Sequence, residues 1–209
     1  FEDIQVYPDL AGKKALVRMN VRASSSAKGE IALSARSFNT NVNHEIAPVY
    51  QTVTVRKGDN PLEMELPMGQ NFLTWDEFSP ALYRLTATLK NGKQIETKQV
   101  QFGMREFTIN GKWFYVNGRK TMLRGTVENC DFPLTGYAPM DVASWERVFR
   151  ICRSYGLNHM RFHSFCPPEA AFIAADLVGF YLQPEGPSWP NHGPKLGNGQ
   201  PIDKYLMDE

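Results

Sequence analysis

Polar and charged residues with the chemistry of a ligand site stand at three places in the second half of this sequence, each just after a short apolar run. They are Glu128 and Asn129 after the first run, Arg161 and His163 after the second, and Glu185, Trp189 and His192 after the third. In sheets of parallel strands, ligands gather at the carboxyl ends of the strands, so we expect these side chains to converge on one rim. Carboxylates, an arginine, histidines and a tryptophan can together bind hydroxyl groups and stack on a pyranose face. The pattern therefore favours a carbohydrate as the ligand.

Several of these residues also have a purely structural interpretation. Arg161 can pair with a carboxylate and organise the rim instead of contacting a substrate, and His163 can be a core histidine. Trp189 and His192 lie in a segment rich in Pro and Gly, residues 187–199. That segment is either a specificity element over the rim or an ordinary surface loop.

Two amphipathic helices and three short apolar strands must position the rim. The helices are expected over 141–155, capped by Asp141, and over 168–179, with Pro168 at the first helical position and Gly179 at the end. The strands are expected at 122–125, 157–162 and 180–183, which gives a β-α-β-α-β order of parallel strands with right-handed crossovers. No glycine-rich phosphate loop follows any of the three strands, and this favours a (β/α)8 barrel over an open doubly wound sheet.

The first half of the chain has a different period. Apolar residues alternate with polar ones, as in Val17, Met19 and Val21, and about seven short strands over roughly a hundred residues predict an immunoglobulin-like β-sandwich. Asn-Gly pairs at 91–92, 110–111 and 117–118 are expected to close tight hairpins, and the pair at 91–92 can take up positive φ at both central positions. We therefore expect a sandwich over 1–105 and the first part of a TIM barrel over 106–209.

The charge balance excludes partners that need a strongly charged surface. Lys and Arg total 23 against 22 Asp and Glu, a formal net charge of +1, so we expect neither nucleic acid nor a membrane as a partner. No apolar stretch is long enough to span a bilayer. The three cysteines, Cys130, Cys152 and Cys166, lack zinc-type spacing, and we expect no metal and no cofactor. Phe1 opens no signal peptide, which leaves the localisation open.

Short motifs along nearly the whole chain, in this order and spacing, resemble glycoside hydrolase family 2, the group of β-galactosidases, β-glucuronidases and β-mannosidases. The residues that carry the resemblance are Trp75, the runs 79–83 and 102–107, Phe114, Asn117-Gly118, Leu123-Arg124-Gly125, Pro133-Leu134-x-Gly136, Gly156-Leu157-Asn158-x-x-Arg161, and Asp176-x-x-Gly179-Phe180-Tyr181 with Glu185. The resemblance implies a retaining glycosidase as the parent protein, and it favours a periplasmic or secreted location.

The resemblance also implies where the catalytic groups lie. Sugar hydrolysis uses two carboxyls, about 5 Å apart for retention, and nothing in the spacing of Glu128 and Glu185 establishes such a pair. In the family the acid/base glutamate ends the fourth barrel strand and the nucleophile ends the seventh, whereas this chain reaches only the third. Glu128 and Glu185 would then support the rim, with Arg161 and His163 as the substrate-facing members of one wall.

Two departures from the family pattern leave the sugar undetermined. Asn129 stands where the family usually carries a histidine, and in 161–167 His163 comes one place early. A non-catalytic carbohydrate-binding or scaffolding protein remains an alternative, and so does an unrelated α/β hydrolase or transferase. Because three barrel strands leave an open sheet edge, we also expect copies of the chain to associate, as a homo-oligomer or by aggregation.

Overall fold

The structure is a computed structural model that describes residues 1–186, 197, 199, 201, 203 and 204. The chain divides into two compact units, Phe1–Thr121 and Met122–Glu209, each with its own hydrophobic core. Among the described residues, no helix has the length and apolar character needed to cross a membrane.

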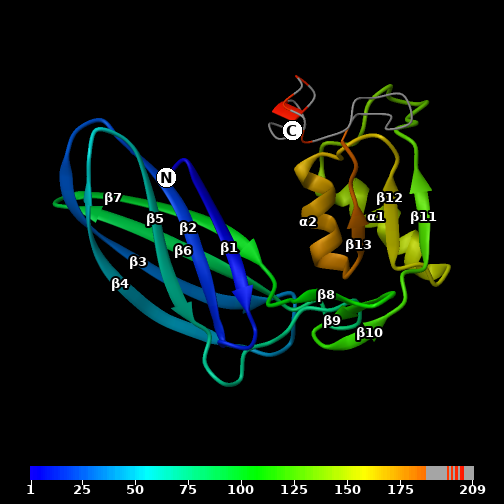
Figure 1. The fold of residues 1–209 in the computed structure, drawn as a ribbon, viewed down its shortest axis with the longest axis horizontal. Helices are drawn as coiled ribbons and strands as arrows, with labels where there is room; N and C mark the ends of the chain where they lie inside the picture. The colour runs from blue at the N-terminus through cyan, green and yellow to red at the C-terminus, as the bar shows by residue number, and fades with distance from the viewer. Residues whose placement is uncertain (187–196, 198, 200, 202, 205–209) are drawn as a thin grey trace. The chain divides into compact units, whose positions relative to one another are not determined.

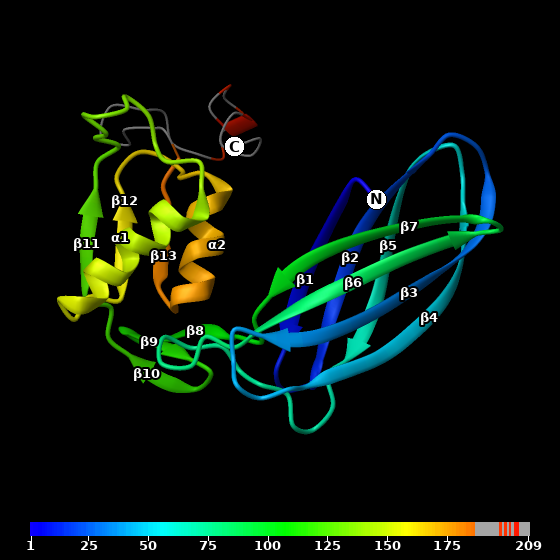
Figure 2. The same ribbon diagram turned by 180° about the vertical axis from the view of Figure 1, so that it is seen from behind.

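The first unit contains a two-sheet sandwich (Figure 1, Figure 2). One sheet has the order β1-β2-β5 and the other β4-β3-β6-β7, with antiparallel pairing throughout. The strands are β1 (Asp3–Asp9), β2 (Lys14–Ala23), β3 (Ala27–Phe38), β4 (Glu45–Val55), β5 (Gly58–Pro67), β6 (Leu82–Asn91) and β7 (Gln94–Phe102). The alternation noted in the sequence is confirmed, because Val17, Met19 and Val21 are buried and the intervening Arg18 is exposed. The seven strands agree with the predicted β-sandwich.

A buried tyrosine hydroxyl ties the sandwich together near the start of β6. The Tyr83 ring is fully buried and stacks on Phe102, with 5.5 Å between ring centroids. Its hydroxyl accepts a hydrogen bond from the Leu73 backbone N–H at 2.8 Å and lies 2.7 Å from Nδ1 of His44. Burial raises the pKa of Tyr83. A tyrosine that bonds back to the preceding connection in this way is a feature of immunoglobulin-like sandwiches.

The outer face of the three-stranded sheet is covered by a row of ion pairs between β2 and β5. Arg18 lies directly opposite Glu63 and Arg22 opposite Asp59, each with a 2.8 Å contact between guanidinium and carboxylate. Lys14 completes the row with Glu65. Each of the three cations on this face of β2 therefore has a carboxylate partner.

Three more strands follow the sandwich and form a small antiparallel sheet in the order β10-β9-β8. They are β8 (Phe107–Asn110), β9 (Trp113–Val116) and β10 (Arg119–Thr121). Of the Asn-Gly pairs, only Asn117-Gly118 has positive φ at both positions, 51° and 74°. The expectation of two positive φ values was wrong for 91–92. There, as at 110–111, the asparagine is the last residue of its strand and the glycine alone of the pair enters the turn.

These three strands belong to the first compact unit, which extends beyond the sandwich to Thr121. The Asn117 side chain links them to the sandwich. Its Nδ2 donates to the Trp75 carbonyl at 3.0 Å, and its Oδ1 accepts from the Glu106 N–H at 2.9 Å. One side chain thus joins the β9–β10 turn to the segment between β5 and β6 and to the residue before β8.

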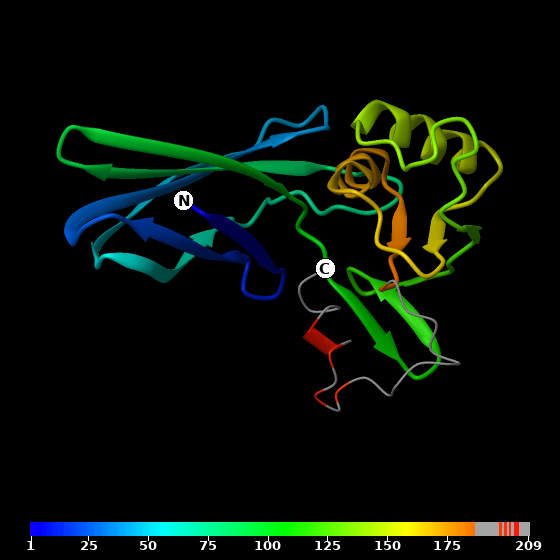
Figure 3. The ribbon, with the colours of Figure 1, turned by 90° about the horizontal axis from the view of Figure 1, so that it is seen from above.

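The second unit contains three parallel strands in the order β11-β12-β13, connected by two helices that cover the same face of the sheet (Figure 3). The elements are β11 (Gly125–Glu128), α1 (Val142–Ser154), β12 (His159–Phe162), α2 (Glu169–Val178) and β13 (Tyr181–Gln183). The predictions are confirmed for the start of α1 and for the end of α2. Asp141 accepts from Ser144 N–H at 2.8 Å as the cap of α1, and Gly179 ends α2 with φ 77°. Pro168 precedes the first helical residue instead of occupying it.

The first parallel strand begins at Gly125, three residues later than the predicted start at residue 122. Asn158, which is buried, donates from Nδ2 to the Met122 carbonyl at 3.0 Å and accepts from the Arg124 N–H at 2.7 Å. These backbone groups therefore pair with a side chain, and the parallel ladder begins at Gly125. A Cβ at Gly125 would lie 2.4 Å from Nδ1 of His159, so a larger residue here would have to displace the His159 ring.

The hydroxyl of Tyr83 gives a direct stability prediction. Tyr83→Phe leaves the Leu73 N–H and His44 without their shared partner, and we expect a loss of about 1–3 kcal/mol in the free energy of unfolding of the first unit. Urea unfolding followed by circular dichroism in the β-sheet region measures it. Tyr50→Phe is the matched control, because Tyr50 is 64% exposed, and it should change the free energy by less than about 0.5 kcal/mol. Equal stability of the two variants would contradict the role assigned to the hydroxyl.

Candidate functional site

The carboxyl ends of β11, β12 and β13 bring five of the predicted rim positions into one connected group. Glu128 ends β11 opposite Phe162, and its carbonyl accepts from the His163 N–H at 2.8 Å. After β13, the Glu185 N–H donates to the Phe165 carbonyl at 3.2 Å. The three strand ends are therefore joined by backbone hydrogen bonds, and their side chains form what we call the strand rim: Glu128, Asn129, Arg161, His163, Ser164 and Glu185.

Glu185 is the centre of the strand rim. Its Oε1 accepts from Nε of Arg161 at 2.5 Å, and its Oε2 accepts from the Ser164 backbone N–H at 2.9 Å. Ser164 has φ 61°, a left-handed conformation that non-glycine residues adopt infrequently. The carboxylate therefore holds the turn after β12 in place while it fixes the direction of the Arg161 side chain.

The electrostatics of this pair determine the protonation state of Glu185. The hydrogen bond from Arg161 lowers the pKa of Glu185, and the Ser164 N–H and the charge of His163 lower it further, against the opposing effect of burial. The same hydrogen bond raises the pKa of Arg161. Glu185 is thus a permanent anion near neutral pH and is unsuited to donate a proton as a general acid.

Arg161 is paired with a carboxylate, as its structural interpretation expected, and its contact with a substrate stays a prediction. Its side chain remains 40% exposed, and Glu185 uses only Nε. An arginine presents five N–H donors in a planar fork. The pairing through Nε orients that fork, and no hydrogen bond or ion pair among the described residues engages its terminal nitrogens.

His163 is half-buried beside Arg161 and Ser164. Its Nδ1 lies 3.1 Å from the Ser164 hydroxyl oxygen, and the tautomer decides which atom donates. The ring is therefore oriented by the same turn that Glu185 holds. A histidine oriented in this way can donate a hydrogen bond to a hydroxyl or accept one from it.

Glu128 closes a turn at the end of β11. Its Oε1 accepts from the Asp131 N–H at 3.3 Å, while Oε2 is buried without a hydrogen-bond partner among the described residues. Cys130 within this turn has φ 59°. The neighbouring Asn129 is exposed. Trp189 and His192, also predicted for the site, lie outside the described residues.

Two residues of this unit have roles that sequence reasoning missed. Ser164 matters through its backbone N–H, and no sequence signal marks a serine with positive φ. Asn158 stands at the opposite end of β12 and sets the start of the parallel ladder. The sequence offered one indication of this role, an asparagine within a predicted apolar strand between Leu157 and Met160. An amide buried there needs hydrogen-bond partners.

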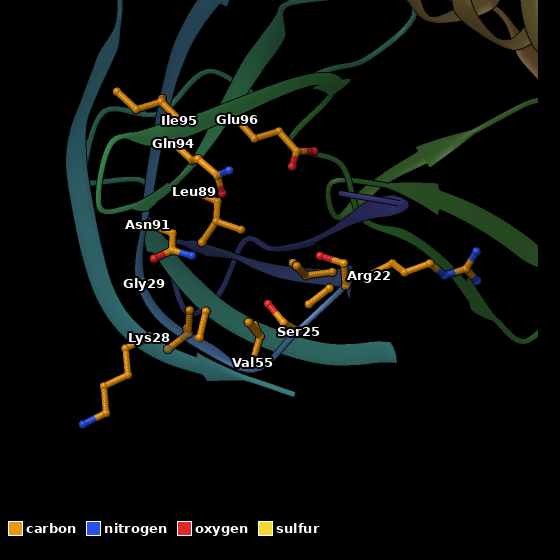
Figure 4. Close-up of a pocket in the computed structure, with 15 residues that line it drawn as sticks. Arg22, Ser25, Lys28, Gly29, Val55, Leu89, Asn91, Gln94, Ile95 and Glu96 are labelled. Atoms are coloured by element: carbon orange, nitrogen blue, oxygen red, sulfur yellow. The ribbon is translucent and has the colours of Figure 1, made fainter. Parts of the chain in front are cut away.

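The first unit has a cavity of about 300 Å³ at one end of the sandwich (Figure 4). Aliphatic residues from both sheets line it, among them Val21, Val55 and Leu89, and Ser25, Asn91 and Gln94 add polar groups. None of the lining residues is aromatic, so this cavity lacks the flat apolar surface on which a sugar ring stacks.

Neither unit offers a metal centre within the part of the chain that the structure describes. No group of three His, Cys, Asp or Glu side chains is placed to hold an ion. The three cysteines form no disulfide. The chemistry of the strand rim is therefore that of an ion pair, an imidazole and amide groups.

The lowered pKa of Glu185 predicts a measurable pH dependence. Glu185→Ala removes both acceptors, and we expect the Ser164 amide to exchange about tenfold faster with deuterium at neutral pH, because a hydrogen bond to a charged acceptor is lost. In the unchanged chain this protection is complete above the ordinary glutamate pKa of about 4.3 and disappears only as the pH falls through the lowered value. Exchange followed by mass spectrometry from neutral pH downwards tests both effects.

Glu146→Ala is the control for this experiment. Glu146 forms an exposed pair with Arg150 at 2.8 Å on α1, and no hydrogen bond or ion pair among the described residues joins it to the turn after β12. Its removal should leave Ser164 exchange unchanged. Equal exchange in Glu185→Ala and the unchanged chain would show that the carboxylate does not hold the turn.

The sequence of this chain is similar to parts of two longer proteins. The chain is 27% identical over 207 residues to a putative β-glucuronidase of Formosa agariphila. This alignment covers 92% of this chain and 24% of the relative. It is 29% identical over 116 residues to a β-galactosidase of Thermoanaerobacterium thermosulfurigenes, 55% of this chain and 16% of the relative. The chain thus spans about a quarter or less of these relatives.

Solved structures show the same fold. A β-glucuronidase from Bacteroides uniformis superposes with a TM-score of 0.72 at 18% identity, over 99% of this chain and 24% of that structure. A family 2 member from Bacteroides cellulosilyticus gives 0.70 at 21% identity, over 88% and 25%. Residues 1–105, half of the 209-residue chain, match the family described as glycosyl hydrolases family 2. This chain belongs to glycosyl hydrolases family 2.

Proposed function

We propose that the chain is part of an enzyme that hydrolyses O-glycosidic bonds in carbohydrate with retention of configuration, and that the strand rim is one wall of its substrate site. The observation that carries the proposal is the Arg161–Glu185–Ser164 arrangement at the carboxyl ends of parallel strands, in a chain of this family. The names of the relatives, β-galactosidases and β-glucuronidases, support the substrate class.

We further propose that β11, β12 and β13 are the first three strands of a (β/α)8 barrel. Two features support this: the strands follow one another in sheet order, and α1 and α2 lie on the same face. In such a barrel the carboxyl ends of the strands face the active site. The strand rim would then occupy the catalytic face.

Within this site, the residues have distinct roles. Arg161 and His163 bind substrate hydroxyl or acidic groups through N–H donors, and Glu185 positions Arg161 and the turn after β12. Glu128 and Asn129 form the neighbouring part of the wall. Trp189 and His192 are assigned to the same wall on the sequence alone.

Neither glutamate of the rim suits the role of catalytic acid or nucleophile. Both oxygens of Glu185 are engaged and its pKa is lowered, whereas a catalytic acid needs a raised pKa. Glu128 closes a turn through Oε1. We therefore propose that the acid/base and the nucleophile belong to residues outside this chain, in a longer protein.

Aryl glycosides test the function. We expect the 209-residue chain to release no nitrophenol from 4-nitrophenyl β-galactoside or β-glucuronide, and the longer protein to hydrolyse at least one of them with retention. Proton NMR of the first-formed anomer reports the stereochemistry. Turnover by the short chain would overturn the placement of the catalytic carboxylates. Polysaccharide binding by the longer protein without any hydrolysis would favour the non-catalytic alternative.

In the active longer protein, Arg161→Ala should lower kcat/KM about a hundredfold, because a misplaced positioning or binding group costs that much in a preorganised site. Arg147→Ala is the control, since Arg147 is exposed on α1. Steady-state kinetics of both variants decide the point. Equal kcat/KM values would remove the strand rim from the substrate site.

Association of the isolated chain is a further expectation of this proposal. β11 and β13 are edge strands of the described sheet, and an open parallel edge can pair with another copy. We expect a mass that increases with concentration in size-exclusion chromatography with light scattering. A constant monomer mass up to the solubility limit would contradict it.

A further inference from the structure

The outer face of the four-stranded sheet has a hollow of about 910 Å³ that none of the preceding roles explains. All four strands of the sheet line it. The side chains that form its floor are Ser34, Arg36 and Phe38 on β3, Arg84 and Thr86 on β6, and Gln99 on β7. The register places these residues on one face, since Ser34 lies opposite Thr86, Arg36 opposite Arg84, and Thr86 opposite Gln99.

A bulge in β4 opens the hollow. Between the pairs Leu33–Val49 and Ala35–Ile46 the register shifts, so two residues of β4, Ala47 and Pro48, stand opposite the single Ser34. Pro48 has no N–H to donate to the ladder. The small side chains of Ser34 and Thr86 form a low floor beside it, and all of these residues line the hollow.

Arg84 carries a positive charge at this floor without a carboxylate partner among the described residues. Its guanidinium lies over the Phe38 ring, 4.7 Å from the centroid. Its neighbour Arg36 is paired with Glu45 at 3.2 Å. On the opposite sheet, Arg18 stacks on Tyr7 at 5.0 Å in a similar way but is paired with Glu63 at 2.8 Å. Arg84 and Arg18 thus both stack on an aromatic ring, but only Arg18 is also paired with a carboxylate among the described residues.

The other groups around Arg84 suit a sugar. Gln99 donates to the Thr86 hydroxyl at 3.1 Å, and Ser34 and Glu45 also line the hollow, so donors and acceptors for ring hydroxyls surround the floor. Phe38 offers an apolar surface, and Tyr50, opposite Ala32 on the same face, is 64% exposed. Aromatic faces beside hydroxyl-binding groups are what a pyranose ring needs.

We propose that this hollow binds a polysaccharide through an anionic sugar residue, with the carboxylate or sulfate of that residue held by Arg84. Carboxylate and sulfate oxygens both match the planar fork of a guanidinium. The site lies in the sandwich unit and is distinct from the strand rim in the second unit. It goes beyond the proposed hydrolytic function and requires no turnover.

Affinity electrophoresis of the complete 209-residue chain tests the proposal, with polygalacturonate, a sulfated galactan or a neutral galactan cast in the gel. We expect retardation by at least one acidic polymer and weaker or no retardation by the neutral one. The acidic polymer that retards the chain more strongly identifies the source as uronate or sulfate. Since the formal net charge is only +1, non-specific attraction to polyanions is small.

Two arginine variants with the same net charge separate the site from general electrostatics. Arg84→Gln should weaken binding to the acidic polymer about tenfold, the effect of losing one charge-assisted hydrogen bond. Arg18→Gln should leave binding unchanged. Gln99→Ala should weaken it as well, by about threefold to tenfold, and circular dichroism of each variant checks that the sandwich is folded.

Three results would overturn the proposal. They are no retardation in either acidic gel, equal retardation in acidic and neutral gels, and an equal loss of binding in folded Arg84→Gln and Arg18→Gln. Binding is measured here without hydrolysis. Failure of this proposal therefore leaves the proposed function intact, and failure of the aryl glycoside assay leaves this one intact.

Discussion

The second unit depends on one buried side-chain amide. The Asn158 side chain bonds to the backbone at Met122 and Arg124. The backbone carbonyl of Asn158 accepts from the Tyr181 N–H at 2.8 Å. A single residue therefore fixes the amino-terminal ends of all three parallel strands. Because strand residues rise about 3.3 Å each, the position of this clamp determines which side chains emerge at the other end. The strand rim exists where it does because the register is set at its far side.

At the rim itself, the carboxylate that stabilises the turn after β12 also fixes the side chain that we propose binds substrate. Glu185 neutralises Arg161, holds the Ser164 turn and orients His163 through that turn. A buried or half-buried cation is retained most easily when its partner also satisfies neighbouring backbone groups. The arrangement gives the arginine one direction while leaving part of its fork exposed. Such preorganisation is what the proposed role in substrate binding requires.

Features set by local sequence could be predicted, and features set by distant partners could not. The cap at Asp141 and the left-handed end at Gly179 involve neighbours within a turn, and both were predicted correctly. The start of β11 was misplaced because its cause, Asn158, lies 34 residues away. The convergence of Arg161 and Glu185 followed from the rule for parallel strands, but the unusual φ of Ser164 did not. The contrast between Arg84 and Arg18 needs the strand register, which the sequence pattern leaves undefined.

The Asn117 bridge has a consequence for how such chains are divided and recombined. The family match ends at residue 105, whereas the compact unit extends to Thr121. A cut at the end of the match would remove the amide that satisfies the Trp75 carbonyl. Trp75 is itself buried, and a Cβ on Gly103 would lie 2.8 Å from its Cβ, so this corner has no room to rearrange. The segment that the family model matches and the segment that packs as one compact unit therefore end at different residues. A sandwich exchanged between relatives should include β8, β9 and β10.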